Sequence, residues 1–84
     1  MKSDTTRMFH FSWVFNQSEL SDTSYNEYVN HRARQSLGNL VFNCLEESPD
    51  TYLIALLPTE ESPHKYDHEL TIRVWTVKVK RVAL

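Results

Sequence analysis

A short segment, HKYDH at 64–68, holds the residues of this sequence that are best suited to bind a metal. His64, Asp67 and His68 supply donor atoms that zinc accepts, but a zinc site needs four protein ligands, or three and a water. Only Cys44 and the more distant histidines can complete such a set, and Cys44 has apolar neighbours. We therefore interpret this segment as a solvated polar loop, and we expect neither a bound metal nor another cofactor.

Catalytic residue types are present, but they form no recognisable motif. Nucleophilic catalysis needs a nucleophile, a base and a group that orients the base. The chain has Cys44 and several serines but no Gly-x-Ser-x-Gly motif, and its one glycine, Gly38, excludes a glycine-rich phosphate loop. A small ribonuclease would need a histidine base and cations for the phosphate, and His10, His31, Arg32 and Arg34 are of these types. Nothing in the sequence places those four together, so we expect no enzymatic activity.

An alternating aromatic row marks the first structural element. Phe9, Phe11, Trp13 and Phe15 occupy every second position of the segment 8–16, which is the period of a β-strand. Two functions fit such a row: the floor of a core beneath a helix, or an exposed platform on which bases stack. A stacking platform needs interleaved basic residues, but the residues between these rings are His10, Ser12 and Val14, and Arg7 lies only at the edge of the row. We therefore predict that these rings form the floor of the core.

A helix is predicted from Tyr25, because apolar residues then recur at helical spacing as far as Leu37. Ser24 and Glu27 form a capping-box pattern, and Asp22 is an alternative N-cap. Two interpretations of the next segment remain open. The helix either continues to about residue 46 or ends at Gly38, a residue type that favours helix C-termini, so that 39–46 is a strand. We favour the strand, joined to the next one by a proline turn at 47–51.

Two further strands are predicted, at 51–57 and 69–84, separated by a polar loop. The apolar face of the last strand switches near Trp75, and we expect a β-bulge or a sharp bend there to restore one buried face. The prediction is an α+β fold of order β-α-β-β-β, in which one helix packs on a twisted antiparallel sheet. The 84 residues fit one small domain, and we expect residues 1–6 to be a flexible N-terminus.

Charge is segregated along the second half of the chain. Acidic residues dominate from 46 to 69, whereas every charged residue from 70 onward is basic. Such a dipolar surface favours oriented docking on another protein, so we expect a small regulator or inhibitor that binds a protein and can also form a homodimer. The expected partner-binding residues are Arg73, Trp75, Lys78, Lys80, Arg81, Glu60 and Glu61.

A nucleic-acid-binding protein is the alternative, although the net charge of −2 argues against it. Its phosphate contacts would come from Arg32, Arg34, Lys78, Lys80 and Arg81. The single cysteine permits no intramolecular disulfide, and no segment resembles a signal peptide or a membrane span. We therefore expect a cytoplasmic protein with no membrane partner.

Overall fold

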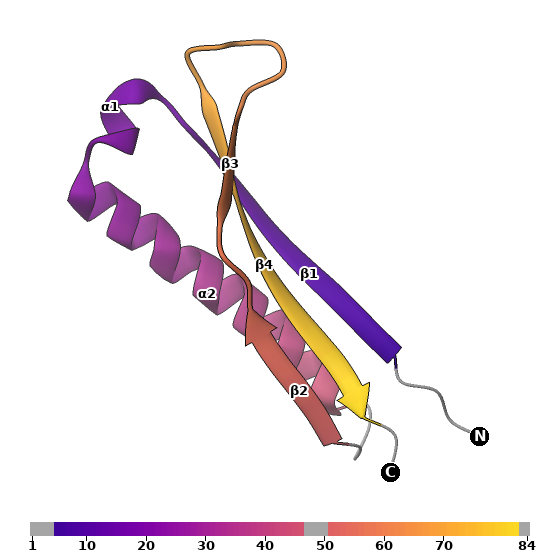
Figure 1. Ribbon diagram of the computed structural model, residues 1–84. Helices are drawn as coiled ribbons and strands as arrows, with labels where there is room; N and C mark the ends of the chain where they lie inside the picture. Colours follow the sequence, from indigo (N-terminus) through magenta and orange to yellow (C-terminus); the bar gives the residue numbers. More distant parts are fainter. Residues whose placement is uncertain (1–4, 47–50, 83–84) are drawn as a thin grey trace.

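The computed structural model describes residues 5–46 and 51–82, and it confirms the α+β class. One long helix lies against one antiparallel sheet (Figure 1). The elements in chain order are β1 (Thr5–Phe15), α1 (Gln17–Leu20), α2 (Thr23–Glu46), β2 (Thr51–Leu56), β3 (Glu60–Pro63) and β4 (Thr71–Val82). The predicted turn at 47–51 lies largely outside the described residues, as do residues 1–4 of the expected flexible terminus, whereas Thr5 and Thr6 already belong to β1.

The last strand, β4, forms the centre of the sheet. β1 pairs with one side of β4 along its whole length, while β2 and β3 share the other side. The segment predicted as a loop therefore contains a short strand, β3. Pro58 separates β2 from β3, which is expected because proline cannot donate a backbone hydrogen bond to the sheet. The result is a sheet whose one edge is a continuous strand and whose other edge is divided in two.

The aromatic row does form the floor of the core. Phe15 is fully buried, and the other three rings of the row are partly buried against the same cluster. Phe11 meets Trp75 of β4 edge-to-face, with 5.7 Å between ring centroids. Each large buried aromatic or aliphatic side chain contributes on the order of 2 kcal/mol. The helix supplies the roof of this core with Val29, Ala33, Leu37 and Val41.

The predicted strand at 39–46 is wrong, because α2 continues through Gly38 to Glu46. Gly38 has a negative φ and is an ordinary helical residue. A glycine inside a helix costs about 1 kcal/mol relative to alanine. Burial of Val41 and Cys44, which extend the stripe of Leu37 at helical spacing, contributes more than that. The start of α2 follows the alternative prediction, since the Asp22 carboxylate accepts a hydrogen bond from the Tyr25 N–H at 3.1 Å.

The predicted bulge in the last strand is also wrong, because β4 pairs with β1 in one unbroken register from Thr71 to Arg81. The extra residue lies in the neighbouring strand instead. Leu57 is opposite Thr76, and Glu60 is opposite Val74, so three steps along the β2–β3 segment match two steps along β4. A bulge of this kind reverses which residues face the helix. Ile54 and Leu56 face it in β2, whereas Glu61 faces it in β3.

Replacing Gly38 by alanine tests the continuous helix. A Cβ at this position meets no atom within 4 Å, so Gly38→Ala should stabilise the protein by about 0.5–1 kcal/mol through helix propensity. Urea unfolding followed by circular dichroism measures this change. Gln35→Ala, at an exposed position of the same helix, is the control and should change stability by less than about 0.5 kcal/mol. A destabilised Gly38→Ala protein would mean that the helix ends at residue 38.

Candidate functional site

Two of the expected partner-binding residues, Arg73 and Trp75, lie inside the protein. Trp75 is 3% exposed, and its indole N–H donates a hydrogen bond to Asn30 of α2 at 3.1 Å. The Arg73 side chain is 13% exposed and occupies the helix-facing side of β4, next to Trp75. These two side chains hold the layers together, so they offer little surface to a partner.

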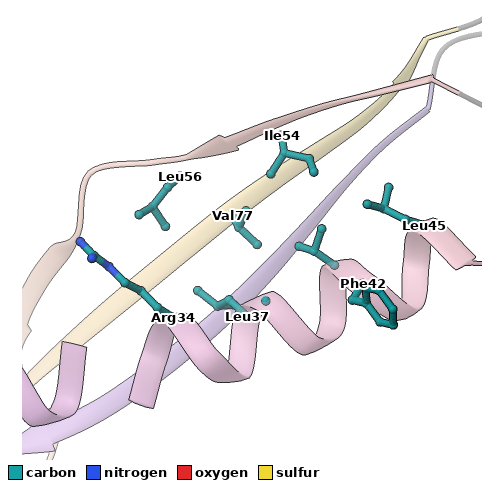
Figure 2. A pocket seen from close by; sticks show the side chains of 9 residues that line it. Arg34, Leu37, Phe42, Leu45, Ile54, Leu56 and Val77 are labelled. Carbon is teal, nitrogen blue, oxygen red and sulfur yellow. The ribbon is translucent and has the colours of Figure 1, made fainter. Parts of the chain in front are cut away.

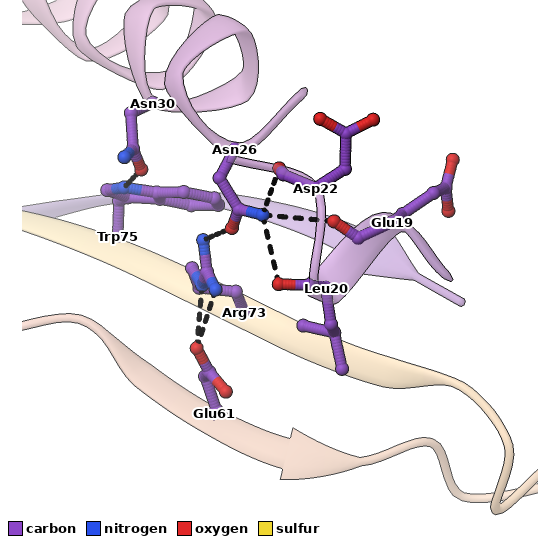
Figure 3. Close-up of polar contacts among 8 residues, drawn as sticks. All are labelled: Glu19, Leu20, Asp22, Asn26, Asn30, Glu61, Arg73 and Trp75. Carbon is purple, nitrogen blue, oxygen red and sulfur yellow. Dashed lines mark hydrogen bonds and ion pairs between the residues drawn. The ribbon is translucent and has the colours of Figure 1, made fainter. Parts of the chain in front are cut away.

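Arg73 connects four elements of the fold (Figure 3). Its guanidinium donates to the Glu61 carboxylate of β3 at 2.8 Å and to the Asn26 side-chain oxygen of α2 at 2.7 Å. The amide nitrogen of Asn26 donates in turn to the backbone oxygens of Glu19, Leu20 and Asp22, which tie α1 to α2. The bulge before β3 is what turns Glu61 toward Arg73. The guanidinium also lies 4.6 Å from the ring centroid of Phe15, at cation–π distance.

The remaining residues of the expected docking surface lie on different sides of the sheet. Lys78 and Lys80 are on the face that α2 leaves uncovered, since they alternate with the buried Val77 and Val79. Arg81 is on the helix side, opposite Tyr52 of β2. Glu60 lines a shallow hollow on the uncovered face, together with Met8, His10, Leu57, Pro58 and Thr76. The structure therefore does not gather the seven predicted residues into one patch.

The basic residues of the nucleic-acid alternative are divided in the same way. Arg32 and Arg34 are exposed on α2, on the opposite side of the sheet from Lys78 and Lys80. Arg32 donates a hydrogen bond to the Tyr28 hydroxyl at 3.2 Å and lies over its ring. A continuous basic track along a nucleic-acid backbone would need these cations on one surface.

The histidines and the cysteine also lie apart. Within the residues that the structure describes, no group of three or more His, Cys, Asp or Glu side chains lies close enough to hold a metal ion. His10 is hydrogen-bonded to the Thr76 hydroxyl at 2.9 Å, and His64 accepts from the Tyr66 N–H at 3.1 Å. Cys44 is buried, and an Arg7 guanidinium nitrogen lies 3.7 Å from its sulfur.

An apolar groove between α2 and β2 is the surface feature that sequence reasoning missed (Figure 2). It exists because α2 packs mainly on β1 and β4 and leaves the helix-facing side of β2 uncovered. Ile54 and Leu56 of β2 are therefore 52% and 53% exposed, and Phe42 of α2 is 60% exposed. The groove has a volume of about 370 Å³, and its lining residues are Arg34, Leu37, Gly38, Val41, Phe42, Leu45, Ile54, Leu56 and Val77.

Unpaired backbone groups lie along the rim of this groove. The Leu57 N–H donates to the Thr76 carbonyl, so the odd-numbered residues of β2 direct their backbone groups toward β4. Tyr52, Ile54 and Leu56 alternate with them and direct theirs away from the sheet, and no partner of these groups is found among the described residues. An apolar wall and an open strand edge thus meet in one place.

Comparison of the chain with protein-family models, with curated proteins and with solved structures finds no match. In the described part of the chain, no helix has both the length and the apolar character that a membrane span requires.

Removal of the Arg73 side chain tests its structural role. Arg73→Ala leaves Asn26 without its charged donor and the aromatic rings without their cation, so it should lower the free energy of unfolding by about 2 kcal/mol. Lys78→Ala removes an exposed cation from the same strand and should change stability by less than about 0.5 kcal/mol. Urea denaturation of both variants measures the difference. Equal effects would show that Arg73 is an ordinary surface cation.

Glu61→Ala separates the ion pair from the rest of this network. The Glu61 side chain is 46% exposed, so its bond to Arg73 is screened by water and should contribute less than about 1 kcal/mol. Thermal and urea unfolding of Glu61→Ala should therefore give a smaller loss than Arg73→Ala. If Glu61→Ala lost more stability than Arg73→Ala, the ion pair with the carboxylate would be the main stabilising interaction of Arg73, rather than its contacts with Asn26 and the rings.

Proposed function

We propose that the protein is a non-enzymatic protein-binding module whose partner lies in the groove between α2 and β2. The observation that carries this proposal is the coincidence of the apolar groove with the open edge of β2. We further propose a regulatory or inhibitory role in the cytoplasm, because the chain lacks a catalytic motif and has a single, buried cysteine.

The geometry favours an extended partner segment that adds a strand to β2. In this mode of recognition, main-chain hydrogen bonds supply affinity and pockets for alternate side chains supply specificity. Tyr52, Ile54 and Leu56 direct their N–H and C=O groups toward such a strand. Every second side chain of the added strand would then point toward α2 and contact Phe42 and Leu45.

The chemistry of the lining predicts what the partner segment contains. Among the described residues that line the groove, Arg34 carries the one charge, and the sequence TYLIAL of β2 carries none. We therefore expect apolar residues at alternate positions of the segment and an acidic residue that lies next to Arg34. The half-exposed side chains of the groove, Phe42, Ile54 and Leu56, each have on the order of 100 Å² that a partner could bury. So small a contact area is characteristic of a transient complex.

Partner binding by the other expected charged residues stays a separate prediction. Lys78, Lys80 and Glu60 lie on the uncovered face and can contact a partner only if it extends around the sheet beyond β2. Arg81 lies on the helix side, opposite Tyr52. Nucleic-acid binding by the basic set also stays a prediction, and its cations are divided between two faces. If it occurs, replacing Lys78, Lys80 and Arg81 by alanine should abolish it and affinity should fall steeply with salt.

Selection from a displayed library of ten-residue peptides tests the proposal, because the groove itself then selects its ligand sequence. Enriched peptides should carry apolar residues at alternate positions together with an acidic residue. Ile54→Glu should lower the affinity of the enriched peptides at least tenfold, measured by fluorescence anisotropy, because it places a charge in the groove. Arg34→Glu should shift the preference at one peptide position from acidic to basic.

Leu53→Glu is the matched control for Ile54→Glu. Leu53 precedes Ile54 in the same strand and is 60% exposed, but its side chain lies on the opposite face of the sheet. It should leave peptide affinity unchanged. Selection of peptides without an alternating apolar pattern, or equal losses in both variants, would contradict a partner in this groove.

A further inference from the structure

The outer edge of β1 is the largest surface of unpaired backbone groups in the described part of the chain. β1 has eleven residues, pairs with β4 in an unbroken register and contains no proline. The opposite edge of the sheet is different, because Pro58 divides it and Glu60, Glu61 and Pro63 follow. Interruption by proline, bulges and charge is how sheets prevent edge-to-edge association. The β1 edge has neither a proline nor a bulge along its eleven residues, so its backbone groups are open to pairing with another strand.

The register identifies the backbone groups on this edge. Thr76 accepts from Leu57 on the β2 side, so the even-numbered residues of β4 direct their backbone groups to β2 and the odd-numbered ones to β1. In β1, the backbone groups of the odd-numbered residues pair with those of the odd-numbered residues of β4. The alternate residues direct their N–H and C=O groups outward, and all five have exposed side chains: Thr6, Met8, His10, Ser12 and Val14.

We propose that the β1 edge pairs with the β1 edge of a second copy of this chain. The two strands run antiparallel around a twofold axis at His10, because this register pairs all eleven residues, from Thr5 with the second copy's Phe15 onward. The strand order across the dimer is then β2-β4-β1-β1-β4-β2, and β1 is no longer an edge. This inference concerns the opposite edge from the groove and does not depend on the proposed function.

The strand is complementary to itself in this register. On the helix-facing side, Phe9 lies opposite the second copy's Phe11, and Arg7 lies opposite the second copy's Trp13. These are an aromatic pair and a cation–π pair, both of which stabilise adjacent strands. On the other side, Met8 lies opposite the second copy's Ser12 and Thr6 opposite the second copy's Val14. No pair opposes two lysines or arginines, or two carboxylates.

The shape of the protein provides a second reason for a dimer. Its Cα radius of gyration is 15.8 Å, whereas a compact domain of this length has one of about 12 Å. Such an elongated molecule buries little of its own surface, and Phe9, Phe11 and Trp13 are only partly buried. A strand of this length extends about 36 Å. Across the smallest dimension of 17 Å, this strip covers on the order of 600 Å² per copy, close to what a stable dimer needs.

The helix layer is compatible with this arrangement. α2 packs mainly on β1 and β4, so the two copies of α2 lie on the same face of the joined sheet, on either side of the axis. Leu40 is exposed and lies about 200° around the helix from Phe42, which lines the groove on the β2 side. Leu40 therefore lies on the β1 flank of α2, where the second copy adds further apolar surface.

Charge substitution at the twofold axis tests both the dimer and its register. Small interfaces have dissociation constants on the order of μM, so the protein should be studied at about 10–200 μM. Sedimentation equilibrium of the unaltered protein should then show twice the monomer mass of 9.9 kDa. His10→Lys and His10→Asp each oppose two like charges at the axis, so each variant alone should shift the dimer dissociation constant upward about fivefold. An equimolar mixture of the two variants should restore the dimer, because lysine then lies opposite aspartate.

The restored mixture shows that both variants fold, and Leu53→Glu, on β2, should leave the dimer intact. A protein that is monomeric throughout this concentration range would overturn the proposal. A dimer that resists both His10 variants, or one that Ile54→Glu disrupts, would also overturn it, because the contact would then lie at β2 or elsewhere.

Discussion

One helix cannot cover this sheet, and most features of the molecule follow from that constraint. The apolar stripe of α2 is wide enough to cover β1 and β4, and it leaves the helix-facing side of β2 exposed. Within residues 5–46 and 51–82, no element covers the second face of the sheet. A core this thin depends on large side chains, and rings from β1 together with Trp75 of β4 supply them beside the valines and leucine of the cluster. The groove and the half-buried aromatic row are both consequences of incomplete coverage.

The polar network around Arg73 takes the place of apolar packing at the end of the molecule where the helix and the sheet diverge. At the α1 end of the molecule, the helix-facing side of β4 changes from valine and tryptophan to arginine and threonine. Asn26, Glu61 and the ring of Phe15 together bind the guanidinium, so a strongly polar side chain fills a position that an apolar one would otherwise hold. The bulge at Pro58 is essential to this arrangement, because without it Glu60 rather than Glu61 would lie opposite Arg73.

The sequence predicts the helix and the strands of this fold better than it predicts where the helix ends and where a strand is bulged. Alternating aromatics and helical spacing identify β1, α2 and β4 because each pattern extends over many residues. Gly38 is misleading, since its local preference for a helix end is worth about 1 kcal/mol and the tertiary burial of Val41 and Cys44 outweighs it. The apolar face of β4 does change near Trp75, but the fold accommodates this change with a bulge in the neighbouring strand and with the partly buried Arg73. No local pattern in the sequence reveals either feature.

Sequence reasoning misses the groove for the same reason that it misplaces the helix end. The two walls of the groove come from residues 34–45 and from Ile54 and Leu56, and they can be adjacent only if the helix continues past Gly38. The signal that could find it is the helical spacing of Leu37, Val41 and Leu45, combined with the uncharged strand that follows. By contrast, the expected docking residues rest on charge and aromatic character alone, and the fold uses Arg73, Trp75 and Glu61 internally.

Residue-resolved amide hydrogen exchange tests the central claim most directly, namely one continuous helix on a sheet with two open edges. We predict slow exchange at 39–43 and alternation in both edge strands, with Phe9, Phe11, Leu53 and Ala55 protected and Met8, His10, Ile54 and Leu56 unprotected in dilute protein. Raising the protein concentration should then slow exchange at Met8 and His10 and leave Ile54 and Leu56 unchanged. Rapid exchange at 39–43, or uniform protection along either edge strand in dilute protein, would contradict this claim.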